Sequence, residues 1–435
     1  MAGVVDRRPQ LKTKVAVIGG GYAGMAAAVA LVDAGYDVTV FETSRVLGGR
    51  ARKVEFDANT TVDNGQHILI GAYRDTLALM KKVGVKEEQA FLRLPLTLRY
   101  PDFHLRAPRL PAPLHLGLAL LTAQGMTWGE KLSAIRFMQW LKKRHFKLDS
   151  DSTVSALLDA HAQPQALRRY LWEPLCISAL NTAAETASAQ VFANVLRDSL
   201  AADRAASDLL IPRVDLSAML AEPAARYVET RGGTVRLSTA VGSISRSDKG
   251  YRLDIEPDVE YSNVIVAVAP YHLPRLLAGL PELTALREQV EALAWEPILT
   301  CYLRYPPGTR LPHAMLGMTD GNAHWFFDRS QLDGTEGLVA AVTSARGRHQ
   351  ELSKGDLATA IDAELRSLHP QLPAPLSSQV ITEKRATFAC TPNLKRPATQ
   401  TVLHGLLLAG DYVASDYPAT IEGAVRSGLK AAALI

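Results

Sequence analysis

Three glycines near the N-terminus have the spacing of a phosphate-binding turn. From Gly19 the chain reads Gly-Gly-Gly-Tyr-Ala-Gly, which places Gly19, Gly21 and Gly24 in a GxGxxG pattern. The first glycine permits a tight turn, the second lets the backbone approach a pyrophosphate, and the third lets a helix pack close to a strand. Tyr22 and Ala23 begin that helix, whose free N–H groups and positive dipole end attract phosphates. The pattern predicts dinucleotide binding.

An acidic residue and a second glycine turn extend this pattern. Glu42 lies eighteen residues after Gly24, where its carboxylate can accept hydrogen bonds from ribose hydroxyls and would repel the 2′-phosphate of NADP. Gly49 and Arg50 then form a flexible turn that can lay a guanidinium against a pyrophosphate. The alternative is a glycine-rich turn without a ligand, in which Glu42 is a solvated charge at a strand end. Strand, glycines, helix and acid in this order favour the dinucleotide.

Two further polar stretches indicate which dinucleotide binds. Residues 63–67 read DNGQH, and an apolar run near the C-terminus ends in Gly410 and Asp411. A helix is expected in residues 417–428, and Pro418 is predicted to open it. A carboxylate at a strand end, directly before a helix N-terminus, suits a ribityl chain and the pyrimidine edge of a flavin. The sequence therefore predicts FAD.

The elements that must position these residues alternate between strand and helix. Residues 14–18 read KVAVI, an alanine-rich helical stretch ends at Gly35, and residues 36–42 read as a second strand. This βαβ unit predicts an α/β fold with a Rossmann-type FAD-binding domain. We expect that domain to be discontinuous and to comprise residues 12–75, 210–270 and 385–435. An inserted, mixed α+β substrate-binding domain is expected in residues 76–209 and 271–384.

Composition and charge exclude several classes of protein. With 435 residues, 47% hydrophobic and 21% charged, the chain is an ordinary globular protein and not a disordered, collagenous or coiled-coil one. A net charge of +4 is too small to indicate a nucleic-acid partner. The three cysteines are far apart and odd in number, so we predict no disulfide framework and no metal site. No signal peptide and no run of about 18 apolar residues is evident, which predicts a cytoplasmic protein.

These motifs resemble the FAD-binding pattern of the amine oxidase and phytoene desaturase superfamily. The resemblance is strongest to its squalene-associated branch, the hydroxysqualene dehydroxylases of bacterial hopanoid synthesis. The segments that indicate this branch are DNGQHILIGAYRDTL (63–77), WEPLCISALNT (172–182), SAQVFANVLRDSL (188–200) and GDYVASDYPATIEGAVRSG (410–428). The resemblance implies reductive dehydroxylation of hydroxysqualene, a hydrophobic C30 isoprenoid alcohol, to squalene. It also implies upstream squalene-pathway enzymes as partners.

The same resemblance assigns residues along the length of the cofactor. The adenine is expected to meet the backbone of Val241, and the adenosine ribose to meet Glu42. The residues implied for the pyrophosphate are Gly19, Gly21, Gly24 and Arg50. Those implied for the ribityl chain and the isoalloxazine ring are Asp411, Gly65, Gln66, His67 and the turn from Glu422 to Ala424, which would face the flavin O2. Helix capping is the alternative role for Asp411 and Glu422. Attachment of the flavin is expected to be non-covalent, because Cys390 lies twenty residues before Gly410.

Two side chains are candidates for the acid that protonates the substrate hydroxyl. Glu173 stands in a branch-specific segment, and His67 is expected near the flavin ring. The alternatives are a helix-capping carboxylate for Glu173 and a structural hydrogen-bonding role for His67. Two other functions also stay open: an FAD desaturase acting on a carotenoid precursor or another isoprenoid, and a prenyl-lipid carrier like the GDP dissociation inhibitors. The intact glycines, Glu42, Arg50 and Asp411 disfavour the carrier, which needs no working flavin.

Residues 105–147 are predicted to contact a membrane. A proline-broken apolar stretch is followed by a helix expected over residues 130–147, with basic residues toward its end. The apolar face of this helix is expected to hold Leu132, Ile135, Met138, Gln139 and Phe146. Such a helix suits the anionic cytoplasmic face of an inner membrane, from which it would draw lipid. The alternative is an amphipathic helix packed on the core with a solvated basic end.

Overall fold

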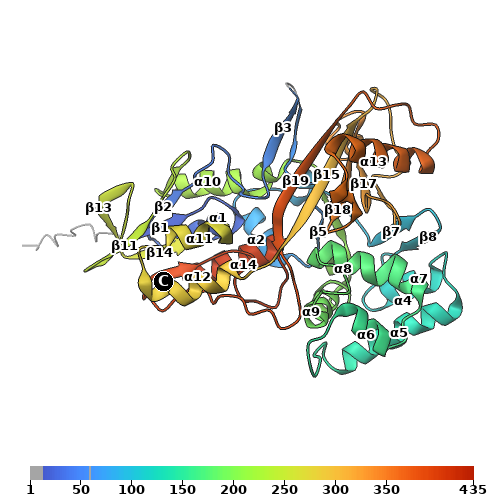
Figure 1. The fold of residues 1–435 in the computed structure, drawn as a ribbon, viewed down its shortest axis with the longest axis horizontal. Coiled ribbons are helices and arrows are strands. Elements are labelled where there is room, and N and C mark those ends of the chain that lie inside the picture. The colour runs from blue at the N-terminus through green and yellow to red at the C-terminus, as the bar shows by residue number, and fades with distance from the viewer. Residues whose placement is uncertain (1–12, 58–59) are drawn as a thin grey trace, which may run out of the picture.

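A five-stranded parallel sheet forms one end of the molecule in the computed structural model, which describes residues 13–57 and 60–435 (Figure 1). The strand order is β10-β2-β1-β14-β20, and each neighbouring pair is parallel. The bounds are β1 Lys14–Ile18, β2 Asp37–Phe41, β10 Thr234–Arg236, β14 Asn263–Val266 and β20 Leu406–Leu408. Apolar runs buried on both faces explain the parallel arrangement. This sheet confirms the predicted α/β, Rossmann-type fold.

Two helices from opposite ends of the chain pack tightly against each other, and the first of them lies on this sheet. They are α1 (Tyr22–Asp33) and α14 (Ile421–Ala432). A Cβ atom at Gly428 would lie 2.0 Å from the carbonyl oxygen of Ala23, so only glycine allows this close approach. Further cover comes from α10 (Glu222–Glu229), α11 (Leu273–Leu276) and α12 (Thr284–Glu291). An antiparallel sheet of β11 (Ile244–Ser247), β12 (Gly250–Leu253) and β13 (Glu256–Tyr261) precedes β14.

A second five-stranded sheet is antiparallel and lies beyond the first. Its order is β16-β17-β18-β15-β19. The bounds are β15 Trp295–Arg304, β16 Met315–Gly317, β17 Trp325–Asp328, β18 Leu338–Ser344 and β19 Ser377–Phe388. Helix α13 (Lys354–Leu368) packs against β15 and β19. These two strands are the longest of the sheet, and in Figure 1 they run from its outer end toward the middle of the molecule.

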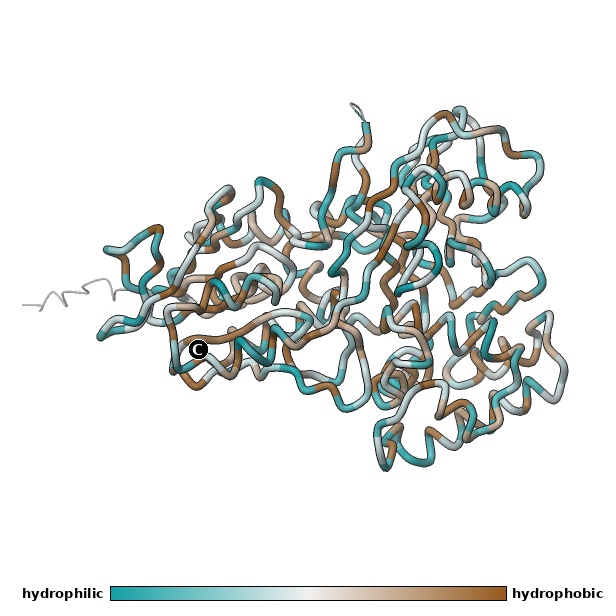
Figure 2. Tube along the Cα trace, viewed as in Figure 1, coloured by the Kyte–Doolittle hydropathy of each residue, from teal (hydrophilic) through white to brown (hydrophobic). Residues whose placement is uncertain are grey.

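A mostly helical part completes the end of the molecule opposite the parallel sheet (Figure 1). Its helices are α4 (Leu114–Thr122), α5 (Trp128–Lys143), α6 (Val154–Ala160), α7 (Gln165–Leu167), α8 (Glu173–Leu180) and α9 (Ala189–Ser199). Short strands form three small sheets: β3 (Lys53–Asp57) with β4 (Thr60–Asp63); β5 (Leu69–Ile70), β9 (Leu209–Pro212) and β6 (Phe91–Leu94); and β7 (Thr97–Tyr100) with β8 (Phe103–Arg106). Helices α2 (Arg74–Lys82) and α3 (Glu87–Ala90) lie between β5 and β6. Figure 2 shows hydrophobic stretches alternating with hydrophilic ones throughout both ends.

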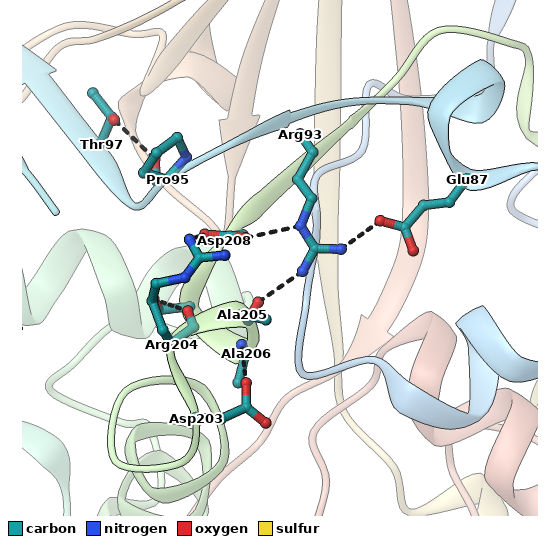
Figure 3. A network of polar contacts seen from close by, with 10 residues as sticks. Glu87, Arg93, Pro95, Thr97, Asp203, Arg204, Ala205, Ala206 and Asp208 are labelled. Carbon is teal, nitrogen blue, oxygen red and sulfur yellow. Dashed lines mark hydrogen bonds and ion pairs between the residues drawn. The ribbon is translucent and has the colours of Figure 1, made fainter. Parts of the chain in front are cut away.

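An ionic network around the buried side chain of Asp208 holds the small β5-β9-β6 sheet to the turn that follows α9 (Figure 3). Asp208 is almost fully buried, and its two carboxylate oxygens accept from Arg93 at 2.8 Å and from Arg204 at 3.1 Å. Arg93 also donates to the carbonyl oxygen of Ala205 and pairs with Glu87. Paired charges are tolerated in such a buried place because each guanidinium meets an acceptor.

Several predicted boundaries differ from those in the structure. The boundaries drawn after residues 75, 209 and 384 fall inside α2, β9 and β19, so the division into two domains stays a prediction. Pro418 does not open the last helix. Helix α14 begins at Ile421, because the Thr420 side chain accepts the Gly423 N–H at 3.0 Å and caps it.

The residues predicted to share one face of α5 differ in burial, and Phe146, which lies beyond the end of α5, is buried. The residues of α5 that are buried are Lys131, Ala134, Phe137 and Leu141, whereas Leu132 is 46% exposed. The aliphatic stem of Lys131 takes a buried position that its charge would not suggest. Within the described residues, no helix is both long and apolar enough to cross a bilayer.

Candidate functional site

The GxGxxG turn adopts the shape that its glycines predict. A Cβ atom at Gly19, where φ is +113°, would lie 2.6 Å from the carbonyl oxygen of Ala267. A Cβ atom at Gly24 would lie 1.9 Å from the carbonyl oxygen of Gly19. Both glycines are therefore required by the turn itself and by the packing of α1 on β1.

Gly21 differs from the other two glycines, because no packing contact requires it and the space in front of it is open. A Cβ atom there would meet nothing closer than the Cα of Gly49, at 3.9 Å. The second glycine turn lies directly against the first, and the Gly48 N–H donates to the Gly20 carbonyl at 3.0 Å. Side chains at Gly21 and Gly49 would enter the shared space between the turns. The two turns thus form a cradle that fits a pyrophosphate.

Helix α1 directs its N-terminus into this cradle. Its N-cap, Gly21, has no side chain to satisfy the first N–H groups, and the first turn holds no acidic residue that would compete with a phosphate. The Tyr22 hydroxyl donates to the Leu216 carbonyl at 2.7 Å, and Ala23 packs against α14. Tyr22 and Ala23 therefore contribute backbone rather than side chains to the cradle.

Glu42 and the loop that carries Val241 lie together at the end of β2. The Glu42 carboxylate accepts the N–H groups of Gly20 at 2.6 Å and Ser44 at 2.8 Å. The Glu42 carbonyl accepts the Thr239 N–H at 2.9 Å. This hydrogen bond places the loop that leads to Val241 next to Glu42. Each carboxylate oxygen keeps acceptor capacity for a ribose hydroxyl. The structure thus brings the two predicted adenosine residues together.

Arg50 and Asp411 bond to each other. The guanidinium of Arg50 donates to the Asp411 carboxylate at 2.6 Å and to the Ala386 carbonyl of β19 at 2.5 Å. Burial opposes the charged form, but the adjacent Asp411 carboxylate raises the pKa of Arg50 above its ordinary value. The pair joins the second glycine turn, the C-terminal motif and the antiparallel sheet at one place. The roles of Arg50 toward the phosphates and of Asp411 toward the ribityl chain stay predictions.

The segment from Gly65 to His67 contacts the middle of β15. The Gln66 N–H donates to the Thr300 hydroxyl at 3.3 Å. The Nδ1 atom of His67 lies 2.6 Å from the Gly65 carbonyl, which can only accept, so Nδ1 carries the proton and Nε2 is an acceptor. Burial lowers the pKa of His67, so the ring is neutral at neutral pH. This favours a hydrogen-bonding role for His67 over that of a proton-donating imidazolium.

A buried polar cluster behind this segment was not predicted from the sequence. Asp63 is fully buried, and its Oδ1 accepts the Leu216 N–H at 2.8 Å, while Oδ2 has no hydrogen-bond partner among the described residues. Burial raises the pKa of Asp63 to about 7, although the charge of Arg329 opposes the shift. Arg329 donates to the Gln66 side chain at 2.7 Å and pairs with Asp333. The DNGQH motif could have indicated Asp63, but nothing local indicates Arg329, which only folding brings to this place.

The Glu422 side chain faces α2. It accepts the N–H groups of Asp75 at 3.1 Å and Thr76 at 3.0 Å, and the Thr76 hydroxyl at 2.7 Å. It therefore caps the N-terminus of α2, which was the alternative role. The N–H of Ala424 is bonded to the Thr420 carbonyl at 3.0 Å within the first turn of α14. Contact of this turn with a flavin O2 stays a prediction.

Glu173 stands at the first position of α8 and is half-buried. Burial raises its pKa, and the nearby charge of Glu185 raises it further. The other end of α8 holds the contacts with β15 and β19, where Asn181 donates to the Pro297 carbonyl at 3.2 Å and to the Thr387 hydroxyl at 2.9 Å. Eight helical residues span about 12 Å. In residues 13–57 and 60–435, no hydrogen bond or ion pair joins Glu173 to His67, so the structure does not bring the two acid candidates together.

Comparison with known proteins decides the family. A sequence profile described as flavin-containing amine oxidoreductase matches residues 22–435. A hydroxysqualene dehydroxylase from Sinorhizobium fredii is 31% identical over 97% of this chain and 97% of its own. The chain belongs to the hydroxysqualene dehydroxylase family. A probable zeta-carotene desaturase from Synechococcus elongatus is 25% identical over 96% of this chain and 98% of its own. A solved oxidoreductase from Methanosarcina mazei shares the fold, with a TM-score of 0.74, 16% identity, and coverage of 96% and 99%.

Membership of the hydroxysqualene dehydroxylases confirms that the chain is a flavin-dependent oxidoreductase whose cofactor is FAD. The carrier alternative is therefore wrong. The residues present fit FAD, because the open cradle at Gly21 and Gly49 accepts a pyrophosphate and the acidic end at Glu42 suits a ribose. The ion pair of Arg50 and Asp411 joins the second glycine turn to the C-terminal motif.

Proposed function

We propose that this protein removes the hydroxyl group of hydroxysqualene reductively to give squalene, using FAD. The observation that carries the proposal is its similarity, along the whole chain, to a hydroxysqualene dehydroxylase. The open glycine cradle supports it, because the reaction needs a bound dinucleotide rather than a degenerate nucleotide fold. When bound, reduced FAD supplies the hydride that replaces the hydroxyl.

The protein's own contribution begins with the leaving group. An allylic hydroxyl is a poor leaving group until it is protonated, so the site must hold an acid that keeps its proton near neutral pH. Burial raises the pKa of Glu173 in the required direction, whereas it lowers that of His67. We therefore assign the proton donor to Glu173. His67 keeps an acceptor, Nε2, that can orient the substrate hydroxyl.

Loss of water leaves an allylic cation, which bulk water would capture. The protein must exclude water around it and hold its carbon in position for hydride transfer. Apolar side chains of the main hydrophobic cluster adjoin the 65–67 segment: Ile68 follows His67, and Ile298 and Tyr302 flank Thr300 along β15. Apolar surroundings of this kind suit a hydrocarbon substrate and a delocalised cation.

The second candidate is an FAD desaturase that acts on a carotenoid precursor. The similarity to a probable zeta-carotene desaturase favours it, but the identity is lower. The two reactions run in opposite redox directions, since dehydroxylation consumes a reduced flavin and desaturation produces one. Substrate and redox state together therefore discriminate between them.

We also propose that the enzyme meets its substrate at the cytoplasmic face of the inner membrane, next to the upstream enzymes that supply it. A C30 isoprenoid alcohol partitions into bilayers, so an enzyme that uses it gains from contact with lipid. The stretch 105–147 is the proposed contact.

The test is an anaerobic incubation of the flavoprotein, chemically reduced, with hydroxysqualene, followed by gas chromatography of the lipid extract. Squalene is the expected product, and phytoene offered to the oxidised enzyme should be recovered unchanged. Gly21→Leu is the matched control, because its side chain would enter the cradle and abolish flavin binding without touching α8. Desaturated carotenoid, or no squalene from a flavin-loaded enzyme, would refute the proposal.

A further inference from the structure

Helix α4 exposes a row of leucines that no other element covers among the described residues. Leu114, Leu118 and Leu121 are 62%, 39% and 38% exposed. Their spacing of four and three residues places them on one face of the helix. The opposite face is buried through His115 and Ala119. Helix α4 is therefore anchored on one side and apolar on the other.

Helix α5 continues this apolar surface at its N-terminal end and carries basic residues toward its C-terminal end. Trp128 and Leu132 are 65% and 46% exposed. The same face of α5 next carries Arg136 and Lys143, both exposed. The Lys131 ammonium donates to the Leu121 carbonyl at 2.8 Å, which fixes the two helices to each other. Of the ten large hydrophobic side chains that are exposed in the described part of the chain, five lie on these two helices.

Positive charge is concentrated around these leucines. Residues 105–147 hold eight Lys or Arg and one acidic residue, a net charge of +7, whereas the whole chain carries only +4. The acidic residue, Glu130, is held in the capping box of α5 by Thr127. Figure 1 shows α4 and α5 at the edge of the helical end, away from the parallel sheet.

We propose that the exposed faces of α4 and α5 form a docking surface for an anionic lipid bilayer. The leucines of α4 and Trp128 enter the boundary between headgroups and acyl chains, and the basic residues of α5 contact the headgroups. A second copy of the chain fits less well, since two surfaces of this charge would repel each other and an apolar patch of five side chains is small beside the roughly 20–30 residues per side of a stable interface. The inference rests on the proposed function and deepens it, because it names the two faces within residues 105–147 that would make the proposed membrane contact.

The test measures sedimentation of the flavin-loaded full chain with phosphatidylcholine vesicles, with and without phosphatidylglycerol. The parent protein should sediment with the anionic vesicles and stay in the supernatant with the neutral ones. In Leu114→Ser/Leu118→Ser the partition coefficient should fall by about tenfold or more, since each buried leucine side chain contributes several-fold. The control Leu376→Ser/Val402→Ser removes two comparably exposed apolar side chains elsewhere and should bind as the parent does.

A second pair of variants tests the charge. Replacing Lys142, Lys143 and Arg144 with Glu should abolish binding, because each basic residue near an anionic surface contributes roughly fivefold. The control triple variant places Glu at three exposed positions elsewhere and changes the net charge equally; its positions are Lys249, Lys354 and Lys395. Equal binding of the two triple variants would overturn the proposal, since total charge alone would then explain the attraction.

Depth-dependent quenching locates the surface directly. Brominated lipid should quench the fluorescence of Trp128, and Trp128→Phe should remove most of that signal. If the patch instead held two copies together, light scattering would show a dimer for the parent and a monomer for the leucine variant, and neither protein would bind vesicles. That result would overturn the proposal. Turnover of substrate in detergent micelles should be unchanged in the leucine variant, so failure of docking is distinguishable from failure of the proposed activity.

Discussion

Replacing Asp63 with Asn tests whether the buried cluster behind the 65–67 segment holds a proton at neutral pH. The carboxyl is fully buried, and burial raises its pKa from 3.8 to about 7. A raised pKa means that the folded state binds the proton more tightly than the unfolded state does. The stability that this group contributes is therefore fully present below pH 3.8 and is lost as the pH rises to about 7.

The magnitude follows from the shift. A difference of one pKa unit between the folded and unfolded states corresponds to about 1.36 kcal/mol. Because of this carboxyl alone, the free energy of unfolding of the parent should therefore fall by about 3 kcal/mol between pH 5 and pH 8. Asn keeps the oxygen that accepts the Leu216 N–H but cannot ionise. The free energy of unfolding of Asp63→Asn, relative to the parent, should thus rise by about 3 kcal/mol over that interval.

The assay is urea unfolding at pH 5 and pH 8, with both proteins saturated with FAD and followed by tryptophan fluorescence. Other titrating groups are common to both proteins and cancel in the difference. The control is Asp248→Asn at an exposed position, for which the difference from the parent should not change with pH. Parallel curves for the parent and Asp63→Asn would refute the argument that burial holds the proton on this carboxyl.

Three further predictions concern the cofactor and the acid. Acid precipitation should release all flavin into the supernatant, and yellow colour in the pellet would contradict non-covalent binding. Glu42→Arg should raise the dissociation constant for FAD at least tenfold in a fluorescence titration, because charge-assisted hydrogen bonds of about 1.5–3 kcal/mol are lost, whereas an unchanged constant would remove Glu42 from the ribose site. Glu173→Gln should slow dehydroxylation by roughly 10²–10⁴-fold at unchanged flavin content. If Glu173→Gln were fully active, Glu173 would not be the proton donor.

The parts of this protein that the sequence predicts are those in which chemistry and local geometry coincide. The GxGxxG turn is one, because Gly19 and Gly24 fit the turn and the packing of α1, Gly21 leaves the space in front of it open, and a βαβ pattern surrounds them. Glu42 is another, because its position at the end of β2 follows from the length of the unit. Local pattern was sufficient there, since each residue acts on its near neighbours.

Other parts depend on contacts that no local pattern encodes. Arg50 and Asp411 are 361 residues apart, and only the fold shows that they pair. Glu422 was expected near the flavin through its motif, but its side chain caps α2 because the N-terminus of that helix packs against α14. On α5 a lysine stem takes one of the buried positions, which its residue type does not indicate. In each case tertiary packing decided between two roles that the residue type allows equally.

The most direct test of the central claim follows a label from flavin to product. The enzyme carrying flavin reduced with deuterium at N5 is mixed anaerobically with hydroxysqualene for a single turnover, and the lipid is analysed by mass spectrometry. The account predicts squalene with one deuterium at the former carbinol carbon. Squalene without deuterium, formed under conditions in which N5 exchanges with solvent more slowly than turnover, would contradict direct reductive dehydroxylation by the flavin.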